Sequence, residues 1–164
     1  MDFQIKEIQP EDDAAVCQII KQVGQEFGAV GEGYGPSDGE VICMSQHYSD
    51  STGSRYLVAK VDGVIVGGGG IAALSGAEDV AELKKLFLLP TSRGMGIGRA
   101  LAEACLAFAQ AHGYRSCYLD TLCSMKSAIA LYEQLGFQRL DQPFASSEHN
   151  GCDVWMLKEL VVTG

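Results

Sequence analysis

The most constraining part of this sequence is residues 80–121, where a strand leads through a glycine-rich loop into an amphipathic helix and a second strand. Residues 80–89 are typical of a strand, and Pro90 ends it. Apolar residues then recur at helical spacing over residues 99–111, and Gly113 ends this helix. The strand-helix-strand unit predicts one parallel pair of strands joined by a crossover helix.

The rest of the chain alternates between strand and helix patterns. The predicted elements are strands near residues 3–8, 56–61, 64–74, 137–140 and 153–157, a helix from Pro10 through Val23, and helices over 40–48 and 124–135. Asp62-Gly63 is typical of a hairpin turn. Because consecutive strands usually pair antiparallel, we expect a mostly antiparallel mixed sheet in a single domain over residues 1–164, without linkers or repeats.

Composition and charge exclude several classes of protein. The formal net charge is -9, whereas a nucleic-acid-binding protein usually carries a basic face. No apolar run approaches the length of a membrane span, and residues 1–6 lack a signal-peptide pattern. We therefore expect a cytoplasmic protein with no nucleic-acid or membrane partner. An acidic surface would suit a cationic substrate such as an amine, or serve solubility alone.

The cysteines and histidines do not form a metal-binding pattern. None of the six cysteines lies in a C-x-x-C pair, and the three histidines are scattered. Cys17 and Cys105 stand among apolar residues at helical spacing, which indicates core packing. We expect reduced thiols and no metal.

The loop after Pro90 has the properties of a phosphate cradle. It joins a strand to a helix, where several N–H groups lack helical partners and the helix dipole adds positive charge. Gly94, Gly96 and Gly98 leave those N–H groups accessible, and Arg93 and Arg99 add full charges. The dinucleotide fingerprint and the P-loop both fail in register. The alternative is a glycine-rich turn that only shapes the chain.

Two motifs at matching positions resemble one known family. The loop, written Arg93-x-x-Gly96-x-Gly98, is similar to the pyrophosphate loop of the GNAT (Gcn5-related N-acetyltransferase) superfamily. The segment 132–137, Tyr-Glu-Gln-Leu-Gly-Phe, resembles the second signature of that family. The resemblance covers residues 80–137 in motifs and nearly the whole chain in topology. It implies a GNAT-like α/β fold of the α+β mixed-sheet kind, with helices on both faces and a splayed parallel strand pair.

The resemblance also implies a cofactor site for acetyl-coenzyme A. In the family, the strand before the loop bonds the pantetheine arm through its backbone, and the loop N–H groups hold the pyrophosphate. The matching residues are Leu86, Phe87, Leu88, Arg93, Gly94, Met95, Gly96, Ile97, Gly98 and Arg99. Many members carry an asparagine seven residues before the signature tyrosine, but this chain has Met125 there. We expect Ser124 to cap the helix instead.

The implied reaction is the attack of a neutral amine on the thioester, with coenzyme A leaving as a thiolate. Tyr132 matches the family tyrosine near the sulfur and is the expected proton donor, the alternative being a core tyrosine. Glu82 matches the base of histone-type members, and Asp120 stands where some protein N-terminal acetyltransferases carry a glutamate. Either acid could instead be solvated, and Glu82 could pair with a neighbouring lysine. Ordered water is the third alternative for the base.

The acceptor amine is not named by the sequence. The resemblance makes Glu26, Tyr34 and His149 candidate acceptor-site residues, with ordinary surface roles as the alternative. The run 67–70 of four glycines indicates either close approach of a substrate or neighbouring element, or a bulge. The leading hypothesis is an N-acetyltransferase acting on a small-molecule or protein amine. The alternatives are a non-catalytic acyl-coenzyme A sensor or interaction domain, and transfer of a longer acyl group; a homodimer is left open.

Overall fold

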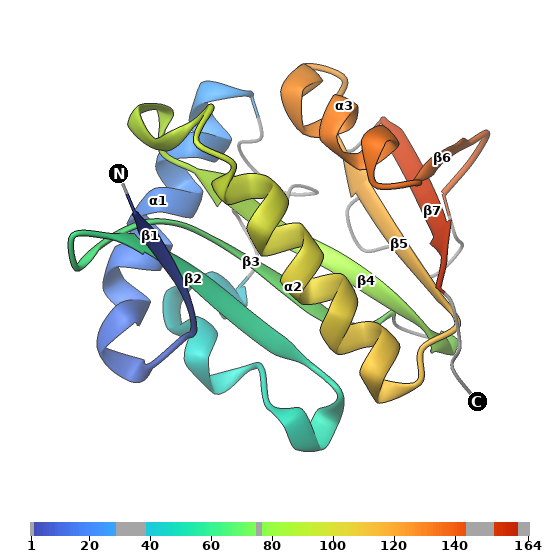
Figure 1. The fold of residues 1–164 in the computed structure, drawn as a ribbon, viewed down its shortest axis with the longest axis horizontal. Coiled ribbons are helices and arrows are strands. Elements are labelled where there is room, and N and C mark those ends of the chain that lie inside the picture. Colours follow the sequence, from blue (N-terminus) through green and yellow to red (C-terminus); the bar gives the residue numbers. More distant parts are fainter. Residues whose placement is uncertain (1, 29–38, 75–76, 144–152, 161–164) are drawn as a thin grey trace.

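A single mixed sheet organises the computed structural model, which describes residues 2–28, 39–74, 77–143 and 153–160. Within these residues the strand order is β1-β2-β3-β4-β5-β7-β6 (Figure 1). The strands are β1 (Phe3–Glu7), β2 (Arg55–Val61), β3 (Val64–Leu74), β4 (Ala77–Leu88), β5 (Ser116–Thr121), β6 (Gln138–Leu140) and β7 (Val154–Glu159). The helices are α1 (Asp13–Glu26), α2 (Ile97–His112) and α3 (Lys126–Gln134), with 3₁₀ turns η1 (Pro10–Asp12), η3 (Gly39–Gln46), η4 (Asp50–Thr52) and η5 (Pro90–Ser92).

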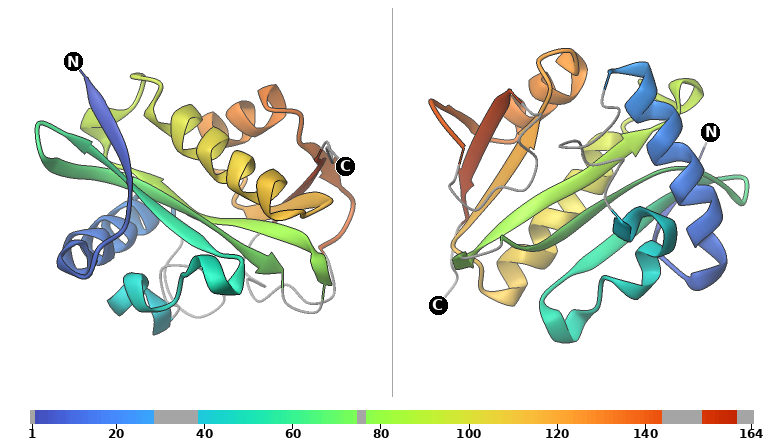
Figure 2. Two further views of the ribbon diagram at one scale, coloured as in Figure 1. Left: turned by 60° about the horizontal axis from the view of Figure 1, so that its bottom comes forward. Right: turned by 180° about the vertical axis from the view of Figure 1, so that it is seen from behind.

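The predicted mixture of strand directions is confirmed. Neighbouring strands pair antiparallel except β4 and β5, which are parallel around the crossover helix α2. The parallel ladder holds only three residue pairs, from Val80–Ser116 to Glu82–Tyr118. Beyond Glu82 the two strands diverge, as the back view in Figure 2 shows. The expected splayed pair is therefore present.

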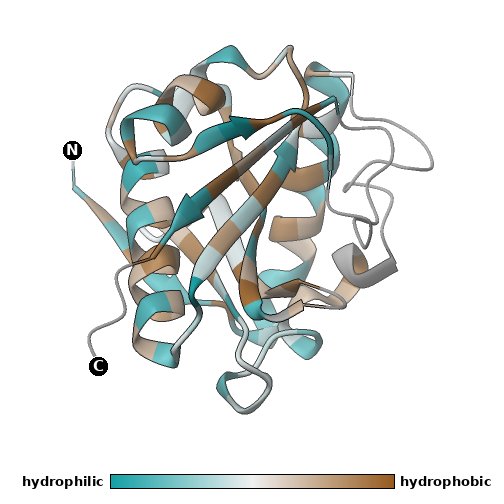
Figure 3. Cartoon of the chain, turned by 90° about the vertical axis from the view of Figure 1, so that its right-hand side faces the viewer, coloured by the Kyte–Doolittle hydropathy of each residue, from teal (hydrophilic) through white to brown (hydrophobic). Residues whose placement is uncertain are grey.

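The helices cover both faces of the sheet, as expected. Helices α2 and α3 lie on one face, and α1 with η3 lies on the other (Figure 2). Each face has its own apolar cluster, one including Leu101 and Tyr132 and the other including Ile20 and Met44. Polar and apolar residues alternate along the strands and helices (Figure 3), because each element buries one side against the sheet. No helix among the described residues is long and apolar enough to span a membrane.

A bulge in β4 explains the four glycines of β3. The pairing register shifts between Gly68 and Gly70, and Lys85 on the facing strand has a φ of 54°. A Cβ on Gly67 would lie 2.6 Å from the Phe87 carbonyl oxygen. A Cβ on Gly68 would lie 2.7 Å from the Tyr56 ring. Both sequence interpretations of the run, close approach of a neighbouring element and a bulge, therefore hold together.

Several predicted boundaries were wrong by a few residues. Residues 40–48 do not form an α-helix, because η3 is a 3₁₀ segment interrupted at Cys43. Strand β4 begins at Ala77, earlier than the predicted residue 80. The hairpin at Asp62 and Gly63 is confirmed, since both residues have the positive φ that such turns require. Cys105 is fully buried, and this burial raises the pKa of its thiol to about 12.

Candidate functional site

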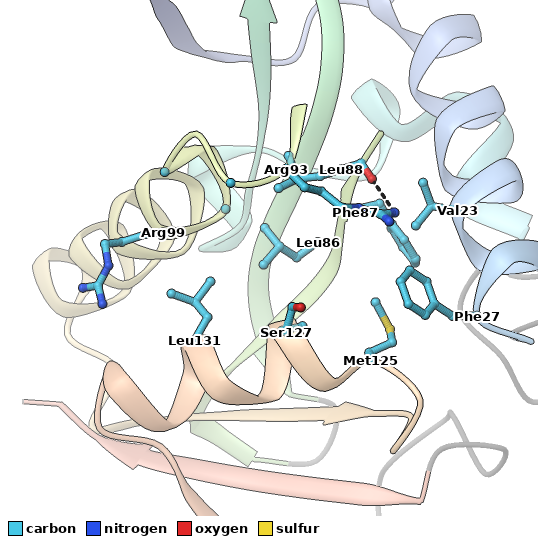
Figure 4. A pocket seen from close by; sticks show the side chains of 14 residues that line it. Val23, Phe27, Leu86, Phe87, Leu88, Arg93, Arg99, Met125, Ser127 and Leu131 are labelled. Carbon is cyan, nitrogen blue, oxygen red and sulfur yellow. Dashed lines mark hydrogen bonds between the residues drawn. The ribbon is translucent and has the colours of Figure 1, made fainter. Parts of the chain in front are cut away.

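A cavity of about 400 Å³ lies beside the end of β4 (Figure 4). Its lining comes from the end of α1 with its C-cap residue (Val23, Phe27), the end of β4 (Leu86, Phe87, Leu88), the glycine loop (Arg93, Gly94, Gly96), the first turn of α2 (Gly98, Arg99), and α3 with its N-cap residue (Met125, Ser127, Ala128, Leu131). Helices α1 and α3 belong to opposite faces of the sheet. They can line one cavity only because β4 and β5 have parted beyond Glu82.

The glycine loop places a row of N–H groups at one end of this cavity. Gly94 and Gly96 have φ values of 81° and 82°, which glycine adopts without strain. The first N–H group to bond inside α2 is that of Ala100, which donates to the Gly96 carbonyl oxygen at 3.0 Å. Among the described residues, nothing accepts a hydrogen bond from the N–H groups of residues 94–99. These groups and the helix dipole suit an anionic ligand.

The glycines of the loop differ in what they provide. A Cβ on Gly94 or Gly96 would meet no atom within 4 Å, so both positions border open space. A Cβ on Gly98 would lie 3.2 Å from Leu88 Cδ1, so this glycine instead lets α2 pack closely on β4. Ile97 is buried in the core, and Met95 packs against the same apolar cluster. Met95 and Ile97 therefore offer a ligand their backbone rather than their side chains.

The two arginines of the loop are already paired with protein groups. The Arg93 guanidinium donates to both carboxylate oxygens of Glu26, at 2.6 and 2.8 Å, and to the Leu88 carbonyl oxygen at 2.9 Å. It also lies over the Phe27 ring, 5.1 Å from the centroid. The hydrogen bond from Arg93 lowers the pKa of Glu26. Arg99 donates to Glu103 and Gln134.

Arg93 thus ties the end of α1 to the glycine loop, and Glu26, expected at the acceptor site, is its ion-pair partner. A second contact joins α1 to α3, because the Ser124 hydroxyl donates to the Phe27 carbonyl oxygen at 2.9 Å. Ser124 does not cap α3, contrary to expectation, since the N-cap residue is Met125 and no side chain caps it. Met125 lines the cavity, and its sulfur accepts a hydrogen bond from the Thr121 hydroxyl at 3.4 Å.

Tyr132 lies in the apolar cluster on the α2 side of the sheet and is not among the residues that line the cavity. It is 5% exposed, and its ring packs against Phe137 at 5.8 Å. Burial raises the pKa of its hydroxyl, so this group keeps its proton at neutral pH. The preceding residue, Leu131, does line the cavity.

The two candidate bases lie on the other side of the sheet from Tyr132. Ala81 and Leu83 point into the α2-side cluster, so Glu82 between them points to the α1 side. Glu82 occupies the last β4–β5 pair, is 8% exposed, and lies 4.0 Å from the Lys84 ammonium. Asp120 stands two residues beyond the partner of Glu82 on β5, opposite Trp155 of β7.

Some expected residues cannot be placed, and some lining residues were missed. Tyr34 and His149 lie outside the described residues. The apolar wall formed by Phe27, Ala128 and Leu131 was not predicted, because apolar residues at helical spacing look like core residues in a sequence. In the described part of the chain, no group of histidine, cysteine and acidic side chains could hold a metal ion.

Comparison of the sequence with known proteins identifies one family. The model of the acetyltransferase (GNAT) family matches residues 24–137, which include both motifs, the glycine loop and the segment 132–137. The uncharacterized N-acetyltransferase YjgM of Escherichia coli (strain K12) is 41% identical over 152 residues, covering 92% of this chain and 90% of that protein. The human N-acetylaspartate synthetase is 37% identical over 98 residues, which are 59% of this chain and 32% of the synthetase.

Solved structures share the fold. An acetyltransferase of the GNAT family from Staphylococcus aureus Mu50 superposes with a TM-score of 0.85 at 19% identity, covering 98% of this chain and all of the other (100%). The PaiA N-acetyltransferase from Thermoplasma acidophilum, solved with coenzyme A, gives a TM-score of 0.77 at 19% identity, covering 97% and 99% of the two chains.

Proposed function

The chain belongs to the acetyltransferase (GNAT) family, and from this premise we propose that it acetylates a primary amine by direct attack in a ternary complex. Acetyl-coenzyme A is the acyl donor. The observation that carries the proposal is the row of N–H groups over residues 94–99, which have no acceptor among the described residues and open onto the cavity. A pyrophosphate fits such a row, because each N–H group can donate to one of its oxygens.

The end of β4 suits the extended arm of the donor. Its edge toward β5 is unpaired beyond Glu82, so backbone groups of residues 86–88 face the cavity rather than a neighbouring strand. The Leu88 carbonyl oxygen already accepts a hydrogen bond from Arg93, which leaves Leu86 and Phe87 for the arm. Arg93 and Arg99 mainly stabilise the position of the loop and of the first turn of α2, since both guanidinium groups are hydrogen-bonded to protein side chains.

We assign Glu82 as the base, with Asp120 as its competitor, and Tyr132 as the proton donor. An ammonium ion cannot attack a thioester, so a base accepts its proton, and a carboxylate does this directly or through water. The leaving thiolate needs a proton donor, and the buried Tyr132 hydroxyl still carries its proton. Glu82 points to the α1 side of the sheet, and Tyr132 lies in the apolar cluster on the α2 side.

An acceptor screen tests the proposal. Purified protein is mixed with acetyl-coenzyme A and a panel of amino acids, polyamines, small metabolic amines and peptides, and free coenzyme A is measured. Because the chain has six cysteines, a reaction without acceptor sets the thiol background. We expect acceptor-dependent release, and N-acetyl product by mass spectrometry. Tight binding of acetyl-coenzyme A with no turnover on any amine would instead support the sensor alternative.

The base is tested by pH profiles of kcat/KM for the parent, Glu82→Gln and Asp120→Asn. If Glu82 accepts the proton, Glu82→Gln loses the low-pH limb of the profile and Asp120→Asn keeps it. Loss only in Asp120→Asn would transfer the role to Asp120. A profile that follows the pKa of the acceptor in all three proteins would assign the step to water.

We also propose a cytoplasmic location. The five cysteines within the described residues are free thiols, which suits a reducing compartment. Measuring the protein in fractionated cells tests this location.

A further inference from the structure

Strand β4 carries three charged residues beside the proposed reaction centre. Glu82 and Lys84 point to the same side of the sheet, and the Lys84 ammonium lies 4.0 Å from the Glu82 carboxylate. Lys85 follows directly. Both lysines stand between Glu82 and the cavity wall that begins at Leu86. An amine that gives its proton to Glu82 therefore comes close to Lys84.

Lys85 has two unusual features. It is 6% exposed, whereas lysine is rarely buried so deeply. It is also the extra residue of the β4 bulge, with a φ of 54° that glycine or asparagine would adopt more easily. The Tyr56 hydroxyl fixes this conformation by donating to the Lys85 carbonyl oxygen at 2.8 Å. Strained residues of this kind cluster at functional sites, so the lysine indicates a role beyond folding.

The adjacent strand completes a charged face. Tyr118 of β5 is paired with Glu82, and alternation places Asp120 on the same side of the sheet. Two acidic residues and two lysines therefore stand at neighbouring positions of β4 and β5, where these strands begin to part. Most of the molecule is acidic, with a net charge of -9, so two adjacent lysines on this strand are a local exception.

We propose that the acceptor is an amine that also carries a carboxylate, such as an α-amino acid, and that Lys84 and Lys85 bind this carboxylate. This inference rests on the proposed acetyl transfer. Charge-assisted hydrogen bonds to the lysines orient the acceptor, while Glu82 takes the proton from its ammonium group. A polyamine or an internal peptide lysine brings no carboxylate, so it cannot form these hydrogen bonds with the lysines.

The test compares acceptors that differ only at the carboxylate. A panel of α-amino acids is assayed with acetyl-coenzyme A against the matching α-carboxamides, which keep the side chain and the amine. We expect kcat/KM to be about tenfold to hundredfold higher for the free acid, the range of one charge-assisted hydrogen bond. Binding of the N-acetyl amino acids and their amides in the presence of coenzyme A, measured by calorimetry, gives a second readout that needs no turnover.

Variants of the two lysines test whether they produce the preference for an acceptor with a carboxylate. Lys84→Met and Lys85→Met should each reduce the acid-to-amide ratio, while Lys84→Arg and Lys85→Arg keep most of it. Lys6→Met, on the exposed edge strand β1, is the matched control and should leave the ratio unchanged. Because each ratio compares two substrates on one protein, a general loss of activity or of folded protein does not alter it.

Three outcomes distinguish a failure of this inference from a failure of the proposed acetyltransferase function. A ratio well above one that falls in both methionine variants supports the inference. Acetylation of amines without regard to the carboxylate, or a ratio that survives both variants, overturns the inference and leaves the acetyltransferase proposal standing. Absence of transfer to every amine, with coenzyme A still bound, overturns the proposed function and the inference with it.

Discussion

Two glycine-rich segments, 67–70 in β3 and 94–98 in the loop before α2, solve different problems. In the loop, Gly94 and Gly96 have positive φ and border open space. In β3, none of the four glycines has a positive φ, yet each would place a Cβ within 2.4–2.7 Å of a neighbouring atom. The loop glycines thus provide conformation and access, whereas the strand glycines provide room for packed neighbours.

The difference teaches that glycine content alone does not identify a binding segment. The strand glycines make room for the bulge of β4 and for the Tyr56 ring, so they affect the reaction centre only through packing. The loop faces the cavity with N–H groups that have no acceptor among the described residues, and we propose that these groups bind the cofactor. Substitutions in the strand should therefore reduce folding stability, and those in the loop should reduce cofactor affinity.

The largest expected effect is in the loop. Gly96→Glu places a carboxylate where the pyrophosphate binds, and we expect at least about a hundredfold loss of acetyl-coenzyme A affinity, near 2.8 kcal/mol. Calorimetric titration measures it. Gly63→Glu is the matched control, because Gly63 has nearly the same φ, 80°, and also borders open space, but lies in the β2–β3 hairpin. Equal affinity in the two variants would show that the loop does not hold the phosphates.

The next effect is on stability. In Gly68→Ala the new methyl group would meet the Tyr56 ring at 2.7 Å and the Leu57 carbonyl oxygen at 2.9 Å, and neither can move freely. We expect a loss of about 2 kcal/mol in the free energy of unfolding, from overpacking. Urea denaturation measures it, with Gly98→Ala as the comparison, because Gly98 belongs to the loop segment and has no positive φ. If Gly98→Ala destabilises the fold as much as Gly68→Ala, the proposed division between the segments fails.

These two segments also show which features can be predicted from the sequence and which cannot. The conformation of the loop could be predicted because it depends on local features, namely a strand end, a helix start and glycines between them. The role of residues 67–70 stayed open between two interpretations, because the atoms that crowd them come from Tyr56, Leu86, Phe87 and Leu88 on other strands. Local spacing predicts conformation, but the identity of a packed neighbour requires the tertiary structure.

The same limit applies at the site. The positions of Glu82 and of the splayed strands followed from the family pattern. The pairing of Arg93 with Glu26 joins residues far apart in the chain, and no local pattern predicts it. The contact of Ser124 with Phe27 replaced an expected helix cap for the same reason. Charged and polar side chains choose among several partners, and the fold decides which partner lies within reach.

A smaller effect tests how the strand bulge is held. Tyr56→Phe keeps the ring that fills the space above Gly68 and Gly70, and it removes the hydroxyl that donates to the Lys85 carbonyl oxygen. We expect a stability loss of about 1 kcal/mol, typical of one buried hydrogen bond. Turnover should fall while acetyl-coenzyme A affinity stays constant, since the bulge orients Lys85 and not the loop. A fall in cofactor affinity instead would mean that the strand segment supports the phosphate site after all.

The smallest expected effect falls on Gly98, the loop glycine that resembles the strand glycines. A methyl group there would lie 3.2 Å from Leu88 Cδ1 and 3.6 Å from Leu131 Cδ2, and both are ends of flexible side chains. Gly98 is also the second residue of α2, where alanine favours the helix by about 0.5–1 kcal/mol. The two terms nearly cancel, so Gly98→Ala should change the free energy of unfolding by less than about 0.5 kcal/mol. Affinity for acetyl-coenzyme A should fall less than about threefold, because Leu88 and Leu131 shift only slightly along the cavity wall. A loss as large as that of Gly96→Glu would place the phosphates against Gly98 itself and extend the open part of the loop into the helix.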